Sequence, residues 1–377
     1  MSEVGRSKAI GRRYEFVILL LLTFSYAILF AFVFRQYAYA EPGGFPVFYT
    51  AGKLARFDFH GLYDRHLQDV FHPANAAVGY FFHLPIELIL LVPLSYLPQV
   101  PAYGCWVFLN LSCLLGVSVV LRRQFPSLSL LVPFAFAPTL SLLLNGQDIG
   151  ILALLLALSF DRFAMRKDFQ AGVLMAIGLF KFPLVIPLAA ILGIRHWRVL
   201  TGFLACGVPI LALSAMALGK QGILDYLALT RGTDAKEDPA ILVNLRGVVG
   251  EVFGPHPALI IAISLVCVVL AGSLRSTRVQ TFCIAIIATV LVSWHAHLYD
   301  ALLLVIPMAW MYESDSTWMR QTPLFLIFLT LIILPNSAHG YWVGIVLSIL
   351  FGLLLSATNV VQPRLGSWIV GRRLTSD

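Results

Sequence analysis

Long apolar runs dominate the chain, and short polar strings separate them. Several runs, among them 16–36, 101–121 and 257–274, are close to the about 20 residues that a helix needs to cross a bilayer. Their apolar residues do not alternate with polar ones, as they would along the strands of a membrane barrel. The pattern predicts an all-α integral membrane protein, a polytopic bundle of about ten transmembrane helices in a single domain, 1–377.

The polar strings and prolines set the predicted boundaries. A segment over 85–98 is short and contains Pro93 and Pro98, so we expect it to be re-entrant or interfacial. The stretch 170–194 has basic flanks at both ends and Pro183 in its middle, which fits two half-helices that enter and return, or one kinked span. The remaining predicted helices are 16–36, 101–121, 128–144, 149–163, 199–219, 257–274, 279–294, 300–313, 322–335 and 340–358.

The composition is also typical of a membrane protein. Charged residues make up 12% of the chain, against about 25% in soluble domains. The net charge of +7 comes from small basic clusters at the ends of apolar runs, which excludes a nucleic-acid-binding stripe. The five cysteines lie inside apolar runs without metal-binding spacing, so we expect them to be packed hydrophobic residues.

Basic residues next to membrane helices favour the cytoplasmic side. The clusters are Arg6, Lys8, Arg12 and Arg13; Arg122 and Arg123; Arg166 and Lys167; Arg195 and Arg198; Arg275 and Arg278; Arg372 and Arg373. With these inside, both termini are cytoplasmic in a plasma membrane of bacterial type. Two loops, 37–82 and 220–256, then lie outside with the polar strings 145–148 and 295–300.

The first outer loop, 37–82, is too long and too aromatic for a plain connection. We expect Gly44–Phe57 to form a short amphipathic helix on the membrane surface. After this loop, His83 and Glu87 are four residues apart, so they are neighbours if the segment is helical. A carboxylate at the start of an apolar helix needs a partner, and His83 is the nearest one.

Three further polar positions are candidates for a site on the outer face. Asp148 follows Gln147 near a helix start, where it is either a helix cap or a functional carboxylate. Lys181 interrupts an apolar stretch, and a buried ammonium requires an anion such as a phosphate or a carboxylate. The alternative for Lys181 is a side chain that extends to the membrane interface.

Two later strings add donors to the same face. Arg246, two residues after Asn244, suits phosphate recognition because a guanidinium binds phosphate through two nitrogens. His295, His297 and Asp300 predict a hydrogen-bonding site rather than a metal site, since no further ligand stands at a diagnostic spacing. We therefore expect no metal and no cofactor.

The order of the polar strings resembles glycosyltransferase family 87, whose members are polyprenyl-phosphate-dependent mannosyltransferase-like enzymes of the GT-C superfamily. The strings that carry the resemblance are Phe45–Gly52, Gly61–Asp64, His83–Glu87 with Pro93-Leu94 and Leu97-Pro98, Asn145–Asp148, Gly178–Lys181, Asn244–Gly247 and His297–Asp300. The resemblance implies a GT-C-like bundle that moves a sugar, mannose or another hexose or pentose, from a polyprenyl-phosphate donor. The acceptor is a glycan, a glycolipid or a lipid on the extracytoplasmic side, and the reaction inverts the anomeric centre.

The chain departs from that family at one position. Family members often have an acidic residue directly before the Phe45–Gly52 string, as the base that activates the acceptor hydroxyl, and this chain has Gly44. Glu41, Asp58 and Asp148 are the candidate catalytic carboxylates in its place. The substrate-binding candidates are His83, Glu87, Gln147, Lys181, Asn244, Arg246, His295, His297 and Asp300.

Two other classes of function remain open at this point. A transporter of lipids or small solutes places charge near broken helices, which fits Lys181 beside Pro183. A family member that binds lipid-linked sugar without transferring it fits the loss of the acidic residue at Gly44.

Overall fold

The computed structural model describes residues 3–40, 44–72, 79–233, 238–334 and 339–360. Within these ranges the chain forms helices and turns and no strand, which confirms the all-α prediction. The first half contains α1 (Glu3–Ala40), α2 (Phe45–Phe57), α3 (Arg65–Phe71), η1 (Pro85–Glu87), α4 (Leu88–Leu94), α5 (Gln99–Leu121), α6 (Val132–Ala135), α7 (Ala137–Asn145), α8 (Ile149–Ala164) and α9 (Asp168–Ile177). The second half contains η2 (Gly178–Lys181), α10 (Phe182–Gly193), α11 (Trp197–Thr233), η4 (Pro239–Ile241), α12 (Leu245–Phe253), α13 (Pro257–Ser273), α14 (Arg278–Val292), η5 (Leu298–Leu304), α15 (Val305–Tyr312), α16 (Thr317–Ile333) and α17 (Tyr341–Val360).

By length and apolar composition alone, four helical stretches could cross a bilayer: Glu15–Phe34, Gln99–Leu121, Asp168–Gly193 and Trp197–Gly232. The third of them folds back on itself, so that its two ends meet. Several shorter apolar helices pack with them in the bundle. Most predicted helices appear within a few residues of their expected bounds, for example α5 for 101–121 and α13 for 257–274. The number of membrane crossings, about ten, stays a prediction.

One predicted helix, 128–144, is wrong as a single element. It consists of two short helices, α6 and α7, which meet at Phe136 with extended backbone. Pro133 and Pro138 each fall in the first turn of their helix, where proline is tolerated because that position needs no amide hydrogen. The apolar composition alone concealed this break.

The long helix α11 bends near the predicted end of helix 199–219. Gly219 has φ 67° and ψ −178° inside it, a conformation that residues with a Cβ rarely adopt. The chain then continues as helix to Thr233. The predicted loop 220–256 therefore contains the end of α11 together with η4 and α12.

The segment from α9 to α10 is a re-entrant hairpin. His196, just past α10, has its Nδ1 3.7 Å from Asp168 Oδ2, at the start of α9. Arg278 also pairs with Asp168. Both ends of the segment therefore lie on the same side as the basic residue Arg278, and η2 forms the tip that carries Lys181. This resolves the two sequence alternatives in favour of two half-helices that enter and return.

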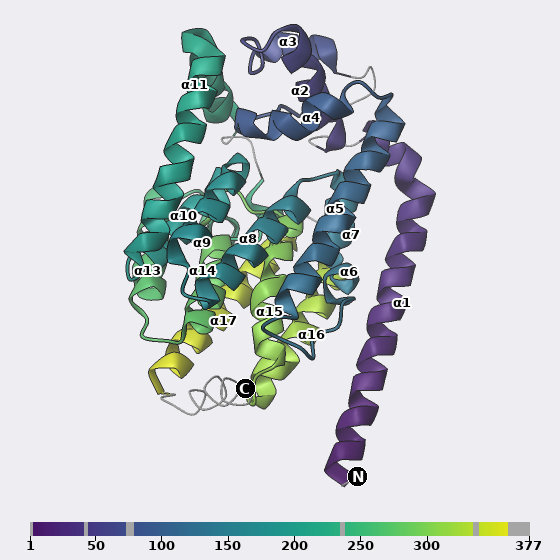
Figure 1. The fold of residues 1–377 in the computed structure, drawn as a ribbon, viewed down its shortest axis with the longest axis vertical. Helices are drawn as coiled ribbons and strands as arrows, with labels where there is room; N and C mark the ends of the chain where they lie inside the picture. Colours follow the sequence, from purple (N-terminus) through teal and green to yellow (C-terminus); the bar gives the residue numbers. More distant parts are fainter. Residues whose placement is uncertain (1–2, 41–43, 73–78, 234–237, 335–338, 361–377) are drawn as a thin grey trace, which may run out of the picture.

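A small cap covers one end of the bundle, formed by α2, α3 and α4 (Figure 1). The start of α1 and the end of α17 lie at the opposite end. A helix forms over Phe45–Phe57, as α2, close to the predicted bounds. The expectation of an amphipathic helix on the membrane surface is wrong, because consecutive residues from Phe45 to Gly52 are all buried under the rest of the protein. Gly52 packs against the backbone of Leu91 in α4, so the part of the first predicted loop that forms α2 is packed against the rest of the cap.

Candidate active site

Asp148 owes its place to a tight turn between α7 and α8. Gly146 ends α7 with φ 59°, and a Cβ at Gly146 would collide with Phe45 in α2. Trp106 of α5 donates from Nε1 to the Gly146 carbonyl at 2.8 Å. Asp148 then precedes α8 with 0% exposure and makes no cap hydrogen bond to that helix. Its carboxylate is directed at other side chains.

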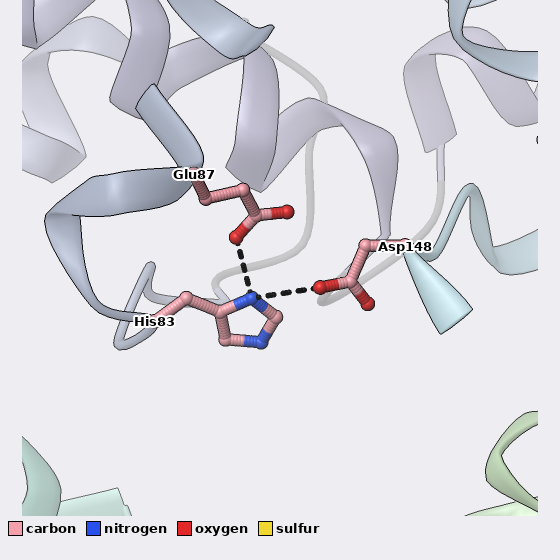
Figure 2. A group of neighbouring side chains, drawn as sticks. All are labelled: His83, Glu87 and Asp148. Atoms are coloured by element: carbon pink, nitrogen blue, oxygen red, sulfur yellow. Dashed lines mark hydrogen bonds and ion pairs between the residues drawn. The ribbon is translucent and has the colours of Figure 1, made fainter. Parts of the chain in front are cut away.

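The predicted pair of His83 and Glu87 forms, and Asp148 joins it. His83 Nδ1 lies 2.7 Å from Glu87 Oε2 and 3.2 Å from Asp148 Oδ2 (Figure 2). Glu87 belongs to η1, and α8 begins directly after Asp148, so two elements far apart in sequence hold one imidazole. Both carboxylates are buried, which makes the His83 proton their shared compensating charge.

Lys181 brings the tip of the re-entrant hairpin into the same cluster. Its Nζ lies 3.1 Å from Asp148 Oδ1 and 3.4 Å from Asp300 Oδ1. It also donates to Gln147 Oε1 at 3.4 Å and sits 5.0 Å from the centre of the Tyr299 ring. The sequence predicted an anionic partner for Lys181, and the described residues supply two carboxylates.

Burial and the charges within the cluster shift the pKa values of its members. Burial by itself would lower the pKa of His83, but the carboxylates of Glu87 and Asp148 raise it to about 9. Burial together with the charge of Asp148 raises the pKa of Glu87 to about 7. Burial opposes ionisation of Asp148 as well, yet Lys181 and His83 hold the pKa of that carboxyl below its usual range. Asp148 is therefore a firmly ionised anchor shared by two cations.

A cavity of about 420 Å³ opens beside this cluster, beneath the cap. Six of its lining residues carry most of its polar chemistry: His83, Gln147, Lys181, His295, His297 and Asp300. The first turn of α10 and the aromatic residue Phe82 also line it. The sequence singled out all six as substrate-binding candidates, and the structure brings them together.

The segment from His295 to Asp300 is held in place by hydrogen bonds between its own side chains and backbone. Asp300 Oδ2 accepts from the His297 backbone nitrogen at 2.9 Å, and the His297 side chain accepts from the Asp300 backbone nitrogen. The His297 ring nitrogen that accepts carries no proton, so the other ring nitrogen is the donor in the neutral ring. His297 therefore supplies a hydrogen-bond donor.

Two candidates from the predicted second outer loop, Asn244 and Arg246, contact the segment that carries His295 and His297; their substrate-binding role stays a prediction. Asn244 is buried, caps α12 by accepting from Gly247 at 2.9 Å, and donates to the Ser293 carbonyl at 2.7 Å. Arg246 donates to the Trp294 carbonyl at 3.4 Å and stacks on that indole ring. Neither belongs to the described cavity lining. They fasten the segment that carries His295 and His297.

The candidate catalytic carboxylates do not gather in the cavity. Glu41 lies outside the described residues. Asp58 is exposed at the end of α2 and accepts from the Gly61 backbone nitrogen at 3.1 Å, away from the cavity lining. Asp148 and Glu87 touch His83 from behind and are not part of the lining either.

Sequence reasoning missed the aromatic residues of the site. Phe48, Phe81 and Phe82 pack on the His83 ring with centroid distances of 5.3, 5.7 and 5.5 Å. Tyr299 lies under Lys181. Their position next to His83 and His297 in the sequence was the available signal, but aromatic residues are frequent throughout this chain.

His83, Glu87 and Asp148 also have ligand atoms within 4.8 Å of one another, a spacing that suits a metal ion. In this arrangement the positive charge comes from the Nδ1 proton and from Lys181, whose Nζ is 3.1 Å from Asp148. An ion there would displace that proton and would lie close to an ammonium. The expectation that no metal is needed stays a prediction.

The family model of glycosyltransferase family 87 matches residues 81–298, more than half of the chain. This chain belongs to glycosyltransferase family 87. The matched range contains His83, Glu87, Asp148 and Lys181, and it ends two residues before Asp300. The protein is therefore a membrane glycosyltransferase. No curated protein and no solved structure matches the chain.

Proposed function

We propose that this family 87 member transfers a sugar from a polyprenyl-phosphate donor to an acceptor hydroxyl on the extracytoplasmic side of the membrane. The observation that carries the proposal is the buried Lys181, which the tip of a re-entrant hairpin presents to the cavity beneath the cap. A buried lysine in a membrane protein marks a functional site by default. A lipid phosphate suits both features, because its phosphate pairs with the ammonium and its lipid chain packs against apolar helices.

The donor phosphate has several groups to bind in this cavity. Lys181 supplies a cation, and His295 and His297 supply ring nitrogens nearby. The helix α10 begins at Phe182, and its first turn lines the same cavity. A helix N-terminus carries partial positive charge that favours phosphate. The lipid chain of the donor would lie along the apolar helices of the bundle.

The chemistry we propose is a single displacement with inversion at the anomeric carbon. As the bond between this carbon and the phosphate oxygen breaks, negative charge builds on the leaving phosphate. Fixed donors at that point stabilise the transition state more than the ground state. Lys181 would provide this stabilisation, while Asp148 and Asp300 hold its ammonium in place. The reaction needs no cofactor beyond the lipid-linked sugar itself.

The test is transfer by the purified protein in nanodiscs, with radiolabelled polyprenyl-phosphate mannose as donor and a crude envelope-lipid extract as acceptor. Parallel reactions use polyprenyl-phosphate glucose and arabinose, because the sugar is not fixed by the site. We expect labelled product from at least one donor. Lys181→Met should reduce the rate by about 100-fold or more, while Lys220→Met at an exposed position should leave it unchanged.

Absence of both transfer and donor hydrolysis with every donor would contradict the proposal. Uptake of labelled lipid or solute into proteoliposomes without transfer would favour the transporter alternative. Tight donor binding without turnover would favour the non-catalytic alternative. Equal rates for Lys181→Met and Lys220→Met would show that Lys181 does not act on the donor phosphate.

A further inference from the structure

His83 presents one ring nitrogen to the cavity and buries the other. Nδ1 faces the oxygens of Glu87 and Asp148, and a carboxylate only accepts hydrogen bonds. Nδ1 therefore carries the proton in the neutral ring, and the lone pair is on Nε2. Figure 2 shows Nε2 on the ring edge turned away from both carboxylates. Since His83 lines the cavity and the two carboxylates do not, Nε2 is the nitrogen that faces it.

The surroundings fix this orientation. Phe48, Phe81 and Phe82 pack around the imidazole, and the Tyr63 hydroxyl donates to the His83 backbone carbonyl. The ring therefore cannot turn without displacing buried aromatic side chains. A group that is held ready in its reactive orientation loses little entropy when it reacts.

The described carboxylates near the cavity are already engaged. Asp148 pairs with Lys181 and His83 through its two oxygens. Asp300 pairs with Lys181 through Oδ1 and accepts from the backbone through Oδ2. Gly44, which precedes α2, has no side chain to offer. Three histidines line the cavity, and His83 is the one whose Nδ1 is paired with two buried carboxylates, which makes its Nε2 a suitable proton acceptor.

Glu87 is suited to stabilise His83 when the ring takes up a proton. Its Oε2 holds Nδ1, while its buried Oε1 has no hydrogen-bond partner among the described residues. An unsatisfied buried oxygen is costly and is retained where it serves a purpose. Here it keeps Glu87 a strong acceptor toward His83 and stabilises the ring once it gains a second proton.

We propose that His83 is the general base of the transfer, an assignment that rests on the proposed function. Nε2 takes the proton of the acceptor hydroxyl while the acceptor oxygen forms its bond to the anomeric carbon. The bond from that carbon to the phosphate oxygen breaks, and its electron pair leaves with polyprenyl phosphate. His83 becomes an imidazolium and later releases the proton to water. Glu87 and Asp148 are its positioning residues.

The charged groups around His83 determine its pH dependence. Glu87 faces it from η1 and Asp148 from the start of α8, with Lys181 of η2 behind Asp148, while α2 contributes only the apolar ring of Phe48. The two carboxylates raise the pKa of His83 to about 9. Because the base must be unprotonated, the rate of transfer should rise with pH until about 9.

The experiment compares His83→Gln with His66→Gln, since His66 is an exposed histidine of α3. It uses the full protein in nanodiscs, with the donor that supports transfer and saturating envelope-lipid extract. We expect His83→Gln to lower kcat by about 100- to 10,000-fold and to abolish the rise of the rate with pH. Donor affinity, measured by quenching of tryptophan fluorescence with polyprenyl phosphate, should change by less than about threefold. His66→Gln should match the wild type.

Three results would overturn the assignment while leaving the proposed function intact. One is a His83→Gln rate within about threefold of the wild-type rate. Another is an unchanged kcat with weaker donor binding, which would make His83 a phosphate-binding group. The third is activity that EDTA removes and zinc restores, which would make the cluster a metal site. A wild-type protein without transfer would instead contradict the proposed function itself.

Discussion

At the scale of single residues, Asp148 is the group on which the site depends. It is fully buried and pairs with both His83 and Lys181. The sequence offered a helix cap or a functional carboxylate for this position. Its side chain makes no cap hydrogen bond to α8, and a catalytic role for it stays a prediction. Asp148 keeps one cation and one imidazole side by side at the edge of the cavity.

Removing Asp148 should therefore cost stability as well as activity. Asp148→Ala leaves Lys181 with one carboxylate, Asp300, in a buried place, and breaking a buried ion pair costs about 3–5 kcal/mol. We expect a lower thermal midpoint in detergent and loss of donor binding. Asp315→Ala, at an exposed position between α15 and α16, is the matched control. A midpoint equal to that of the control would show that the pair is not a stabilising unit.

Glu87 and His83 make stability depend on pH in one direction. The folded-state pKa of Glu87 is raised from 4.5 to about 7, and that of His83 from 6.5 to about 9. In both cases the folded state binds more protons than the unfolded state, so stability falls as pH rises through these windows. We expect the thermal midpoint to decrease from pH 4.5 to pH 9.

Glu87→Gln isolates the contribution of the lower window. This variant has no carboxyl to ionise, so the decrease between pH 4.5 and pH 7 should shrink. Glu251→Gln changes an exposed glutamate of α12 and should keep the wild-type slope. A midpoint that rises with pH over this range in the wild type would show that the pKa of Glu87 is not raised in the folded state.

At the scale of elements, the hairpin of α9, η2 and α10 places Lys181. Helices α9 and α11 approach so closely that Gly172 faces the backbone of Val199 and Gly202 faces that of Phe169. Small residues at such crossings let helices in membranes pack tightly. The crossing fixes the depth of the hairpin, and with it the position of the lysine at its tip.

A larger side chain at this crossing should displace the hairpin. Gly172→Leu would force α9 away from α11 because its Cβ has no space, and we expect a lower thermal midpoint and weaker donor binding. A Cβ at Gly352 in α17 meets no atom within 4 Å, and this position is exposed, so Gly352→Leu serves as the control. Donor affinity unchanged in Gly172→Leu would mean that this packing does not position Lys181.

The elements also show what the sequence could and could not predict. Hydrophobic run lengths located α5, α8 and α13 closely, because a helix in lipid is specified by apolar composition. The break between α6 and α7 was missed, since prolines in the first turn of a helix leave apolar periodicity unchanged. The spacing of His83 and Glu87 predicted their contact, but nothing local indicated that Asp148 would join them.

In the whole molecule, ion pairs of basic residues lie at one end of the bundle and the candidate site lies toward the other. Arg123 pairs with Asp161, and Arg278 and His196 pair with Asp168, at the end where the hairpin begins. The site lies at the hairpin tip, toward the cap. The positive-inside rule then places the basic end in the cytoplasm and the cavity toward the outer face, a sidedness that stays a prediction.

Cysteine accessibility checks this sidedness. In a variant without native cysteines, Asp58→Cys near the cap should react with an impermeant maleimide on intact cells. Lys167→Cys, between α8 and α9, should react only after the membrane is permeabilised. Both positions are exposed, so each serves as the control for the other. The reverse labelling pattern would place the cavity on the cytoplasmic side.

The proposed function requires that the cavity beneath the cap binds the phosphate of a lipid-linked sugar donor. Its most direct test is a cryo-EM structure of the protein in nanodiscs with polyprenyl phosphate added. We expect phosphate density in the cavity within hydrogen-bonding distance of Lys181 Nζ, with the lipid chain leading out between apolar helices. Phosphate density elsewhere, with the cavity around Lys181 and His83 unoccupied at saturating lipid, would contradict it.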